Sequence, residues 1–192
     1  MISYPTFTYF RSFLHQDFYE ELEKYVYSDQ IKWFFRSGTL HPTDYCIEEG
    51  ESQYDCYTWG CSVYNEISDD IANIHDVWKP LIQAIRDQFN SEVHRLQLNL
   101  YTNQNKKIYT KPHYDLGSMR SSLVPDEKFS TIILNFTNCN GGTQILDVEI
   151  PSFKNGAVHF SNLYLHNGIL QTDKVRRICA NIVTYPIEKR HS

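Results

Sequence analysis

The chain has 192 residues, of which 41% are hydrophobic and 15% aromatic, and its formal net charge is -5. This length suits one domain with a substantial core, spanning residues 1–192, and is short for two. The acidic balance argues against nucleic acid or an anionic membrane as a partner, and no apolar run approaches the ~20 residues that cross a bilayer. The sequence leaves the oligomeric state open.

The cysteines are few, scattered and odd in number, and no Cys-x-x-Cys pair occurs among them. With no signal-like start, this pattern predicts a reduced, intracellular chain, and we expect a cytoplasmic protein. Cys56 and Cys61 could in principle form a zinc pair, but their spacing fits such a site poorly. The five residues are Cys46, Cys56, Cys61, Cys139 and Cys179.

Two segments of the first half show helical spacing. Residues 17–27 repeat apolar side chains on one face after Asp17, which we expect to be the N-cap. Residues 77–89 carry a second apolar stripe, and Pro80 is tolerated there because it falls in the first turn. Core packing explains both stripes. Residues 1–92 as a whole are expected to supply a helical cover and segments that frame a substrate.

Residues 33–62 are rich in aromatic side chains, interrupted by glycine, proline and acidic residues. They could form irregular edge strands with surface aromatics, or a loop that frames a pocket. In either case this segment is where we expect substrate contacts.

After Asn90 the period changes from helical to extended. Leu96, Leu98 and Leu100 alternate with polar residues, which predicts a half-buried strand. Further strands are expected at residues 108–115, 131–136, 143–150, 157–161 and 178–185, with turns at 138–142, 151–156 and 167–168. Short strands at this spacing indicate a sandwich or barrel, with residues 93–188 as its core. Residues 116–128 are polar, and could be a lid or an ordinary surface loop.

His113 and Asp115 project from one face if they lie in a strand. Two imidazoles and one carboxylate form the ligand set of a mononuclear non-haem iron(II) site. His166 is the best candidate for the second imidazole, at a point where we expect a strand to give way to a turn. His159 is its nearest rival and suits a strand interior. The other histidines considered lie in a helix, a loop and the tail: His15, His41 and His191.

The order of these motifs resembles the iron(II)- and 2-oxoglutarate-dependent dioxygenases, closest to their prolyl 4-hydroxylase-like branch. The resemblance covers roughly the C-terminal half of the chain. It implies a mainly β fold, a double-stranded β-helix or jelly roll with N-terminal and mid-chain covering helices, and iron(II) held by His113, Asp115 and His166. The motifs are His113-x-Asp115, Asn140-Gly141-Gly142-Thr143, the run from Pro151 to Phe160, His166 and Arg177.

In that family a basic residue, on the strand after the distal histidine, neutralises the far carboxylate of 2-oxoglutarate. Here Arg176 and Arg177 both stand in the matching place. Arg177 shares a strand face with Cys179 and Asn181, whereas the face of Arg176 is apolar. A polar face is the one expected to line a cavity, so Arg177 is the choice for this charge-assisted contact.

Two tyrosines resemble those that contact the cosubstrate in the family. They are Tyr101, on the preceding strand, and Tyr109, close to His113. For each of them a core tyrosine with a satisfied hydroxyl is an equally good interpretation.

The resemblance implies an oxygenase that consumes O2 and 2-oxoglutarate, hydroxylates a substrate, and releases succinate and CO2; it also leaves ascorbate open as a cofactor. The substrate could be a peptidyl-proline, an amino acid or another small metabolite. Two alternatives stay open. One is a cupin-like metal-dependent enzyme that does not use 2-oxoglutarate, which would leave the paired arginines without a role. The other is a non-catalytic jelly-roll binding module.

Overall fold

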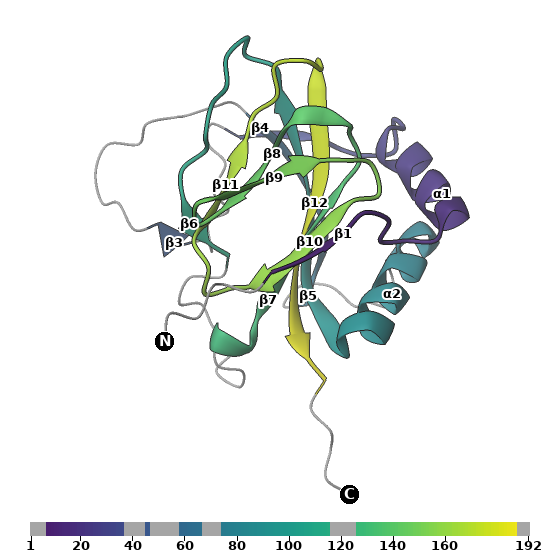
Figure 1. Ribbon diagram of the computed structural model, residues 1–192. Helices are drawn as coiled ribbons and strands as arrows, with labels where there is room; N and C mark the ends of the chain where they lie inside the picture. The colour runs from purple at the N-terminus through teal and green to yellow at the C-terminus, as the bar shows by residue number, and fades with distance from the viewer. Residues whose placement is uncertain (1–6, 37–44, 47–57, 67–73, 116–125, 188–192) are drawn as a thin grey trace, which may run out of the picture.

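The computed structural model describes residues 7–36, 45–46, 58–66, 74–115 and 126–187 (Figure 1). Two antiparallel sheets make up most of it, one of seven strands and one of five. The order is β1-β10-β7-β12-β5-β4-β2 in the first sheet and β3-β6-β11-β8-β9 in the second. The strands are β1 (Thr8–Phe10), β2 (Phe34–Arg36), β3 (Tyr45–Cys46), β4 (Thr58–Asn65), β5 (Ser91–Thr102), β6 (His113–Tyr114), β7 (Ser130–Asn135), β8 (Cys139–Ile145), β9 (Val148–Ser152), β10 (Ala157–Ser161), β11 (His166–Ile169) and β12 (Arg176–Pro186).

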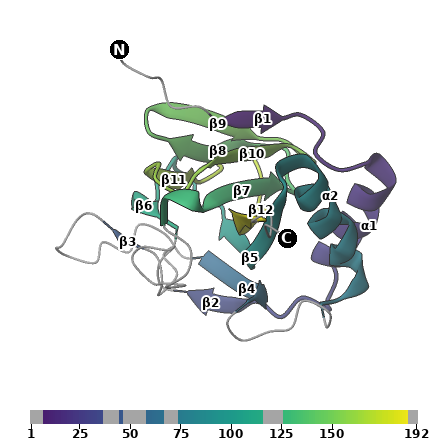
Figure 2. The ribbon, with the colours of Figure 1, turned by 90° about the horizontal axis from the view of Figure 1, so that it is seen from below.

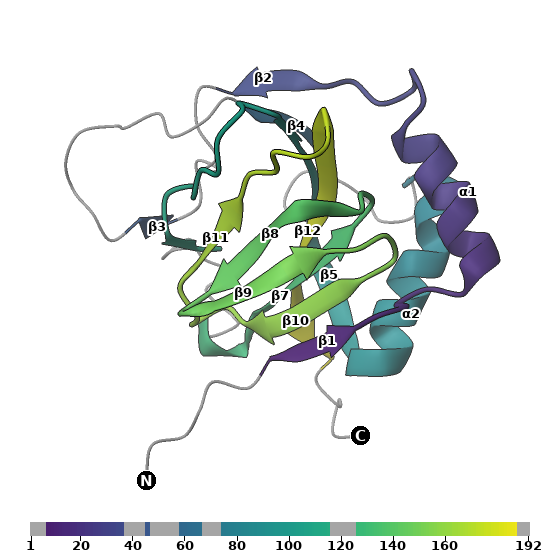
Figure 3. The same ribbon diagram turned by 45° about the horizontal axis from the view of Figure 1, so that its top comes forward.

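The two sheets face each other across an inner apolar cluster. Ile145 and Ile150 of the smaller sheet share it with Ile133, Val158 and Phe160 of the larger one. Figure 3 shows β8, β9 and β11 in front of β12 and β5. This is the expected jelly roll, with strands that alternate between a face toward the other sheet and a face away from it.

The helices cover the outer face of the larger sheet. They are α1 (Gln16–Val26) and α2 (Lys79–Phe89), the latter preceded by the 3-10 turn η2 (Asp76–Trp78). Figure 2 shows them together on one side of the molecule, with β6 and β11 on the opposite side. Their apolar stripes pack on the alternate residues of β5, β7 and β12 that point away from the second sheet. Those residues are Leu96, Leu98, Ile132, Leu134, Ile178, Ala180 and Ile182.

Both expected helices are confirmed, with α1 beginning one residue earlier than predicted. Asp17 is not its N-cap: it lies in the first turn, and the cap position belongs to His15, whose side chain makes no capping hydrogen bond. In the described part of the chain, neither helix has the length and apolarity that a membrane span needs.

Residues 1–92 were expected to form a helical cover, but they also supply strands to both sheets. Strands β1 to β4 all come from this region, and β4 pairs with β5 along most of its length. Part of the aromatic segment is therefore edge strand, as one of its two interpretations predicted. The rest of that segment, and residues 116–125 of the expected lid, lie outside the described residues.

The region 139–152 differs from the expected single strand at 143–150. It forms a hairpin in which β8 and β9 pair, and Leu146 turns the chain with a φ of 51°. Gly141 and Gly142, expected in a turn, lie within β8. A Cβ on Gly142 would stand 2.1 Å from the carbonyl oxygen of Ile150, so this glycine permits the close approach of β9.

Two further expectations about strands are wrong. Of residues 108–115, only His113 and Tyr114 belong to a strand, and Tyr109 makes an isolated bridge to Ile169. Asn167 and Gly168 are strand residues of β11 and not a turn, so His166 begins a strand where we expected it to end one. Strand β5 is also more than half-buried, because the second sheet covers the side on which Arg95 and Gln97 lie.

Asn155 fastens the segment before α1 to the turn before β10. Its side-chain oxygen accepts a hydrogen bond from the N–H of Leu14 at 2.9 Å, and its side-chain nitrogen donates to the carbonyl of Leu14 at 2.8 Å. The residue is buried and has a φ of 58°. It thus combines two buried hydrogen bonds with a left-handed backbone that asparagine tolerates.

We expect Asn155→Ala to lower the free energy of unfolding by about 2–4 kcal/mol, because two buried backbone groups lose their partners and alanine strains the backbone. Urea-induced unfolding measures this. Asn105→Ala is the matched control: Asn105 has a φ of 59° but is exposed, so only the strain of about 1 kcal/mol applies. Equal losses in the two variants would contradict the role given to the Asn155 side chain.

Candidate metal and anion site

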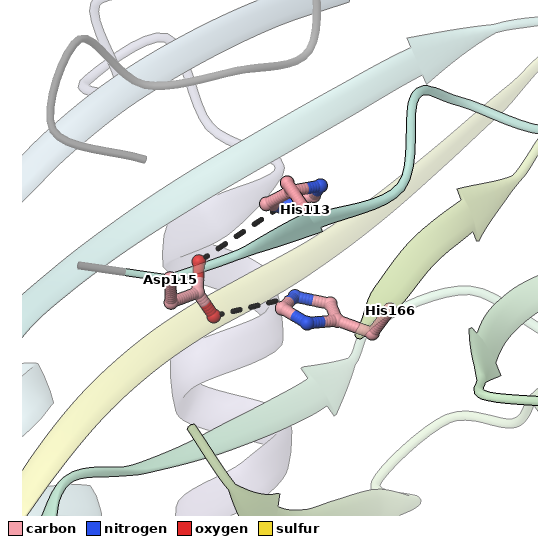
Figure 4. A group of neighbouring side chains, drawn as sticks. All are labelled: His113, Asp115 and His166. Atoms are coloured by element: carbon pink, nitrogen blue, oxygen red, sulfur yellow. Dashed lines mark ion pairs between the residues drawn. The ribbon is translucent and has the colours of Figure 1, made fainter. Parts of the chain in front are cut away.

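The register of two short strands brings the predicted histidines together. Strand β11 pairs with β6 so that His166 lies directly opposite His113, with ring centroids 4.5 Å apart. Asp115 follows His113 by two residues and points to the same side. Its Oδ1 lies 4.0 Å from Nε2 of His113, and its Oδ2 lies 3.3 Å from Nε2 of His166 (Figure 4). All three predicted ligands are buried and converge on one point.

The backbone fixes which ring nitrogen of each histidine faces that point. Nδ1 of His113 lies 2.9 Å from the carbonyl oxygen of Lys111, and Nδ1 of His166 lies 3.3 Å from that of Tyr164. A carbonyl can only accept, so each Nδ1 is placed to donate a proton to the backbone, and Nε2 of each ring is the nitrogen that faces the cluster. Two such nitrogens and a carboxylate oxygen, within 4.8 Å of one another, form a set that could hold a divalent cation.

Three other side chains hold the carboxylate of Asp115. The Thr131 hydroxyl donates to Oδ2 at 2.7 Å, the Asn181 amide donates to both oxygens at 3.1 Å, and Nη2 of Arg95 donates to Oδ1 at 3.0 Å. Complete burial of Asp115 raises its pKa, but His166, Arg95 and His113 more than offset this and hold the pKa well below its ordinary value. The carboxyl group is therefore ionised.

Sequence reasoning did not single out Arg95 or Thr131 for this role. Arg95 is the first residue on the polar side of the alternating strand, and this polar alternation was the signal that could have pointed to it. That side was taken to face water, and the covering sheet makes it an inner face. Asn181 was noted only for sharing the face of Arg177.

A cavity between the sheets, the inter-sheet cavity, adjoins this cluster. Among the described residues that line it there are two guanidinium groups and no carboxylate. The remaining lining is mostly neutral and polar, so the cavity suits an anion. Its lining residues are Arg95, Gln97, Asn99, Tyr101, His113, Ile133, Thr143, His166, Asn167, Gly168, Arg177, Cys179 and Asn181.

Arg177 is the more deeply placed of the two expected arginines. It is 1% exposed, and its guanidinium lies 5.2 Å from the centre of the Tyr101 ring. Its hydrogen bonds to Ile169, Asn135 and Thr143 are long, 3.4–3.5 Å, and Nε makes none with the described residues. No acidic side chain of the described chain forms an ion pair with it, so a buried cation is left with weak neutral partners.

The other residues predicted for the cosubstrate divide between two locations. Tyr101 lines the inter-sheet cavity, as expected. Tyr109 does not: it is 41% exposed, and its hydroxyl donates to Glu149. Arg176 points away from the cavity and lies over the ring of Tyr27 at 4.9 Å, because adjacent strand residues face opposite sides. Of the two arginines, Arg177 is therefore the one whose side chain lines the cavity.

Among the side chains that the structure describes, no cysteine and no histidine other than His113 and His166 belongs to the cluster. His159 hydrogen-bonds Ser130 at 2.9 Å and lies 4.2 Å from the Phe89 ring, in the packed position predicted for it. Cys179 lines the cavity, and burial raises the pKa of its thiol. His41, Cys56 and His191 lie outside the described residues.

No protein-family model and no curated protein matches the chain. Solved structures do match in fold. A viral collagen prolyl hydroxylase from Paramecium bursaria Chlorella virus-1, in a 2-oxoglutarate complex, is 14% identical with a TM-score of 0.61, over 94% of this chain and 96% of that one. The chain has the jelly-roll fold of the iron(II)- and 2-oxoglutarate-dependent oxygenases. The resemblance inferred from the sequence is confirmed at this level.

Two bacterial structures share the same fold. A prolyl 4-hydroxylase from Pseudomonas putida is 11% identical, with a TM-score of 0.59 over 95% of this chain and 94% of that one. HygX from Streptomyces hygroscopicus, solved with nickel, 2-oxoglutarate and hygromycin B, is 9% identical, with a TM-score of 0.55 over 95% and 83%. These identities support a shared architecture, and they leave the chemistry of this chain to be argued from its own residues.

We expect His166→Ala to weaken binding of Co(II), a stable divalent probe, by about two orders of magnitude, because one of three ligand atoms is lost. Isothermal titration calorimetry measures the affinity. His159→Ala is the matched control, since it removes a half-buried histidine of the same fold that lies outside the cluster. A comparable loss of affinity in both variants would show that Co(II) does not bind at His113, Asp115 and His166.

Proposed function

We propose that the chain is an iron(II)- and 2-oxoglutarate-dependent oxygenase that hydroxylates a peptide or a small molecule and releases succinate and CO2. The observation that carries the proposal is a buried arginine, Arg177, with only long neutral contacts, in the same cavity as a His-Asp-His cluster. A cation site and an anion site that share one cavity are what a metal-chelating dicarboxylate requires.

The residues present fit the metal. Two neutral imidazole nitrogens and one carboxylate, from His113, Asp115 and His166, are the donor set of non-haem iron(II) oxygenases. These three would hold the ion and leave its other positions open to ligands. When bound, the iron and the cosubstrate supply the oxidative chemistry, in which O2 is consumed and 2-oxoglutarate becomes succinate and CO2.

The residues of the chain bind and orient the reactants. Arg177 would pair with the far carboxylate of 2-oxoglutarate through two parallel hydrogen bonds, which would offset the cost of its burial. The Thr143 hydroxyl, 3.4 Å from Nη2 of Arg177, stands where it could add a third donor. The Tyr101 ring packs beside the guanidinium. The two sheets exclude bulk water from this pair.

A substrate would approach over the face that β2, β4 and β5 share. Phe34 of β2 lies opposite Gly60 of β4, which in turn lies opposite Asn99 of β5, a residue of the cavity lining. Phe34 is 65% exposed and stands about 10 Å from Asn99 across two strand spacings. An exposed aromatic ring there offers a stacking surface beside the cavity, which fits either a peptide or a ring-containing small molecule.

Each alternative to an oxygenase leaves part of this site without a role. A cupin-like enzyme without 2-oxoglutarate would need the ligand cluster but no buried cation beside it. A binding module without catalysis would need neither the ionised Asp115 nor the orientation of the two imidazoles. The pairing of both features in one cavity therefore supports the oxygenase over these two interpretations of the fold.

We expect Arg177→Met to weaken 2-oxoglutarate binding by about two orders of magnitude, since a charge-assisted bidentate contact is lost. Anaerobic titration of the iron(II) protein follows this through the weak visible charge-transfer band of bound 2-oxoglutarate. Arg176→Met is the matched control: it removes the same charge from the neighbouring residue, whose side chain lies over Tyr27, and should change the affinity by less than about twofold.

Thermal unfolding of both variants shows whether Arg177→Met remains folded. Aerobic succinate formation should follow the same order as 2-oxoglutarate binding, and should be lost in His166→Ala. A wild-type protein that develops no band and binds no 2-oxoglutarate would exclude the oxygenase and favour one of the two alternatives.

A further inference from the structure

Arg95 is a second buried guanidinium in the inter-sheet cavity, and it touches a residue of the proposed metal site directly. Its side chain is 4% exposed, and its Nη2 lies 3.0 Å from Oδ1 of Asp115, which is fully buried. A metal ion at the cluster would use the same carboxylate. Arg95 and the ion would therefore share one negative charge.

That sharing has an electrostatic consequence, because arginine keeps its charge at any ordinary pH. The guanidinium stabilises Asp115 in the absence of metal, and it repels a divalent cation that arrives at the same carboxylate. A lone cation thus meets a carboxylate whose charge is already compensated. The contact makes metal binding weaker than three well-oriented ligands would otherwise allow.

A dianionic cosubstrate changes this balance. 2-Oxoglutarate would bring two negative charges into a cavity whose described lining includes the guanidinium groups of Arg95 and Arg177 and no carboxylate. The repulsion between Arg95 and the metal would then be offset by attraction of both to the dianion. The metal and the cosubstrate would each bind better when the other is present.

We propose that Arg95 couples metal binding to cosubstrate binding, disfavouring the cation alone and favouring it together with 2-oxoglutarate. The inference rests on the proposed function. Arg95 acts on the metal through Asp115, so it is a positioning residue. Its effect comes from its charge and not from the orientation that it gives to Asp115. Orientation of Asp115 is secured without it: Thr131 donates to Oδ2 at 2.7 Å and Asn181 donates to both oxygens at 3.1 Å.

The test is a Co(II) titration of wild type and Arg95→Met by calorimetry, with and without 2-oxoglutarate. Without 2-oxoglutarate, Arg95→Met should bind Co(II) about ten to a hundred times more tightly, because the buried carboxylate now lacks its counter-charge and gains more from the metal. The coupling factor, the ratio of the Co(II) Kd without 2-oxoglutarate to that with it, should fall by about the same factor.

Two control variants separate charge from geometry. Thr131→Val removes a neutral hydrogen bond to Asp115 and changes no charge, so it should not tighten Co(II) binding or alter the coupling factor. Arg95→Lys keeps the charge and should retain most of the wild-type coupling. Near-ultraviolet circular dichroism checks that each variant is folded; should Arg95→Met fail, Arg95→Gln also removes the charge and retains a donor, with the same expected result.

The outcomes distinguish this inference from the proposed function. Weaker Co(II) binding in Arg95→Met, with an unchanged coupling factor, would overturn the inference and leave Arg95 as a purely geometric support of Asp115, with the oxygenase intact. Absence of Co(II) or 2-oxoglutarate binding in the wild-type protein would overturn the proposed function itself, and the inference with it.

Discussion

The pairing of β6 with β11 is the constraint on which the candidate site depends. It places His166 directly opposite His113, and because Asp115 follows His113 by two residues, the same register delivers the carboxylate. A slip of one residue would turn one imidazole to the other side of the sheet. Strand β6 has only two residues, so its neighbours β3 and β11, which pair with it on either side, determine where the ligands lie.

The larger sheet divides stability and chemistry between its two faces. Leu96, Leu98 and Leu100 of β5 point to the helices and belong to the main apolar core, while Arg95 and Gln97 point to the second sheet. Burying charged groups is costly, and the apolar face supplies the compensating free energy. A jelly roll can therefore keep two guanidinium groups and a carboxylate between its sheets, provided that they pair with each other, with amides and hydroxyls, or with a ligand.

Sequence periodicity predicted both helices, most strands and the face of Arg177, because each of these follows from the spacing of apolar and polar residues that are close in the chain. It failed where the deciding contact is distant in the chain. Gly141 and Gly142 resembled a turn, yet Gly142 is needed for the approach of β9, and the actual turn is at Leu146 and Asp147, where a leucine takes the positive φ. The burial of Arg95 could not be read locally either, since a polar strand face looks the same whether water or a second sheet covers it.

The order of side chains along β5 links the two charged ends of the cavity. Arg95, at one end, contacts Asp115, and Tyr101, at the other, lies under the guanidinium of Arg177, which is its cross-strand partner on β12. The two backbone positions are separated by roughly 20 Å of strand, and the inward side chains between them are neutral amides. Long arginine side chains shorten the gap between the charges. A ligand with one negative group near the metal cluster and a second near Arg177, rather than a compact anion, matches that arrangement.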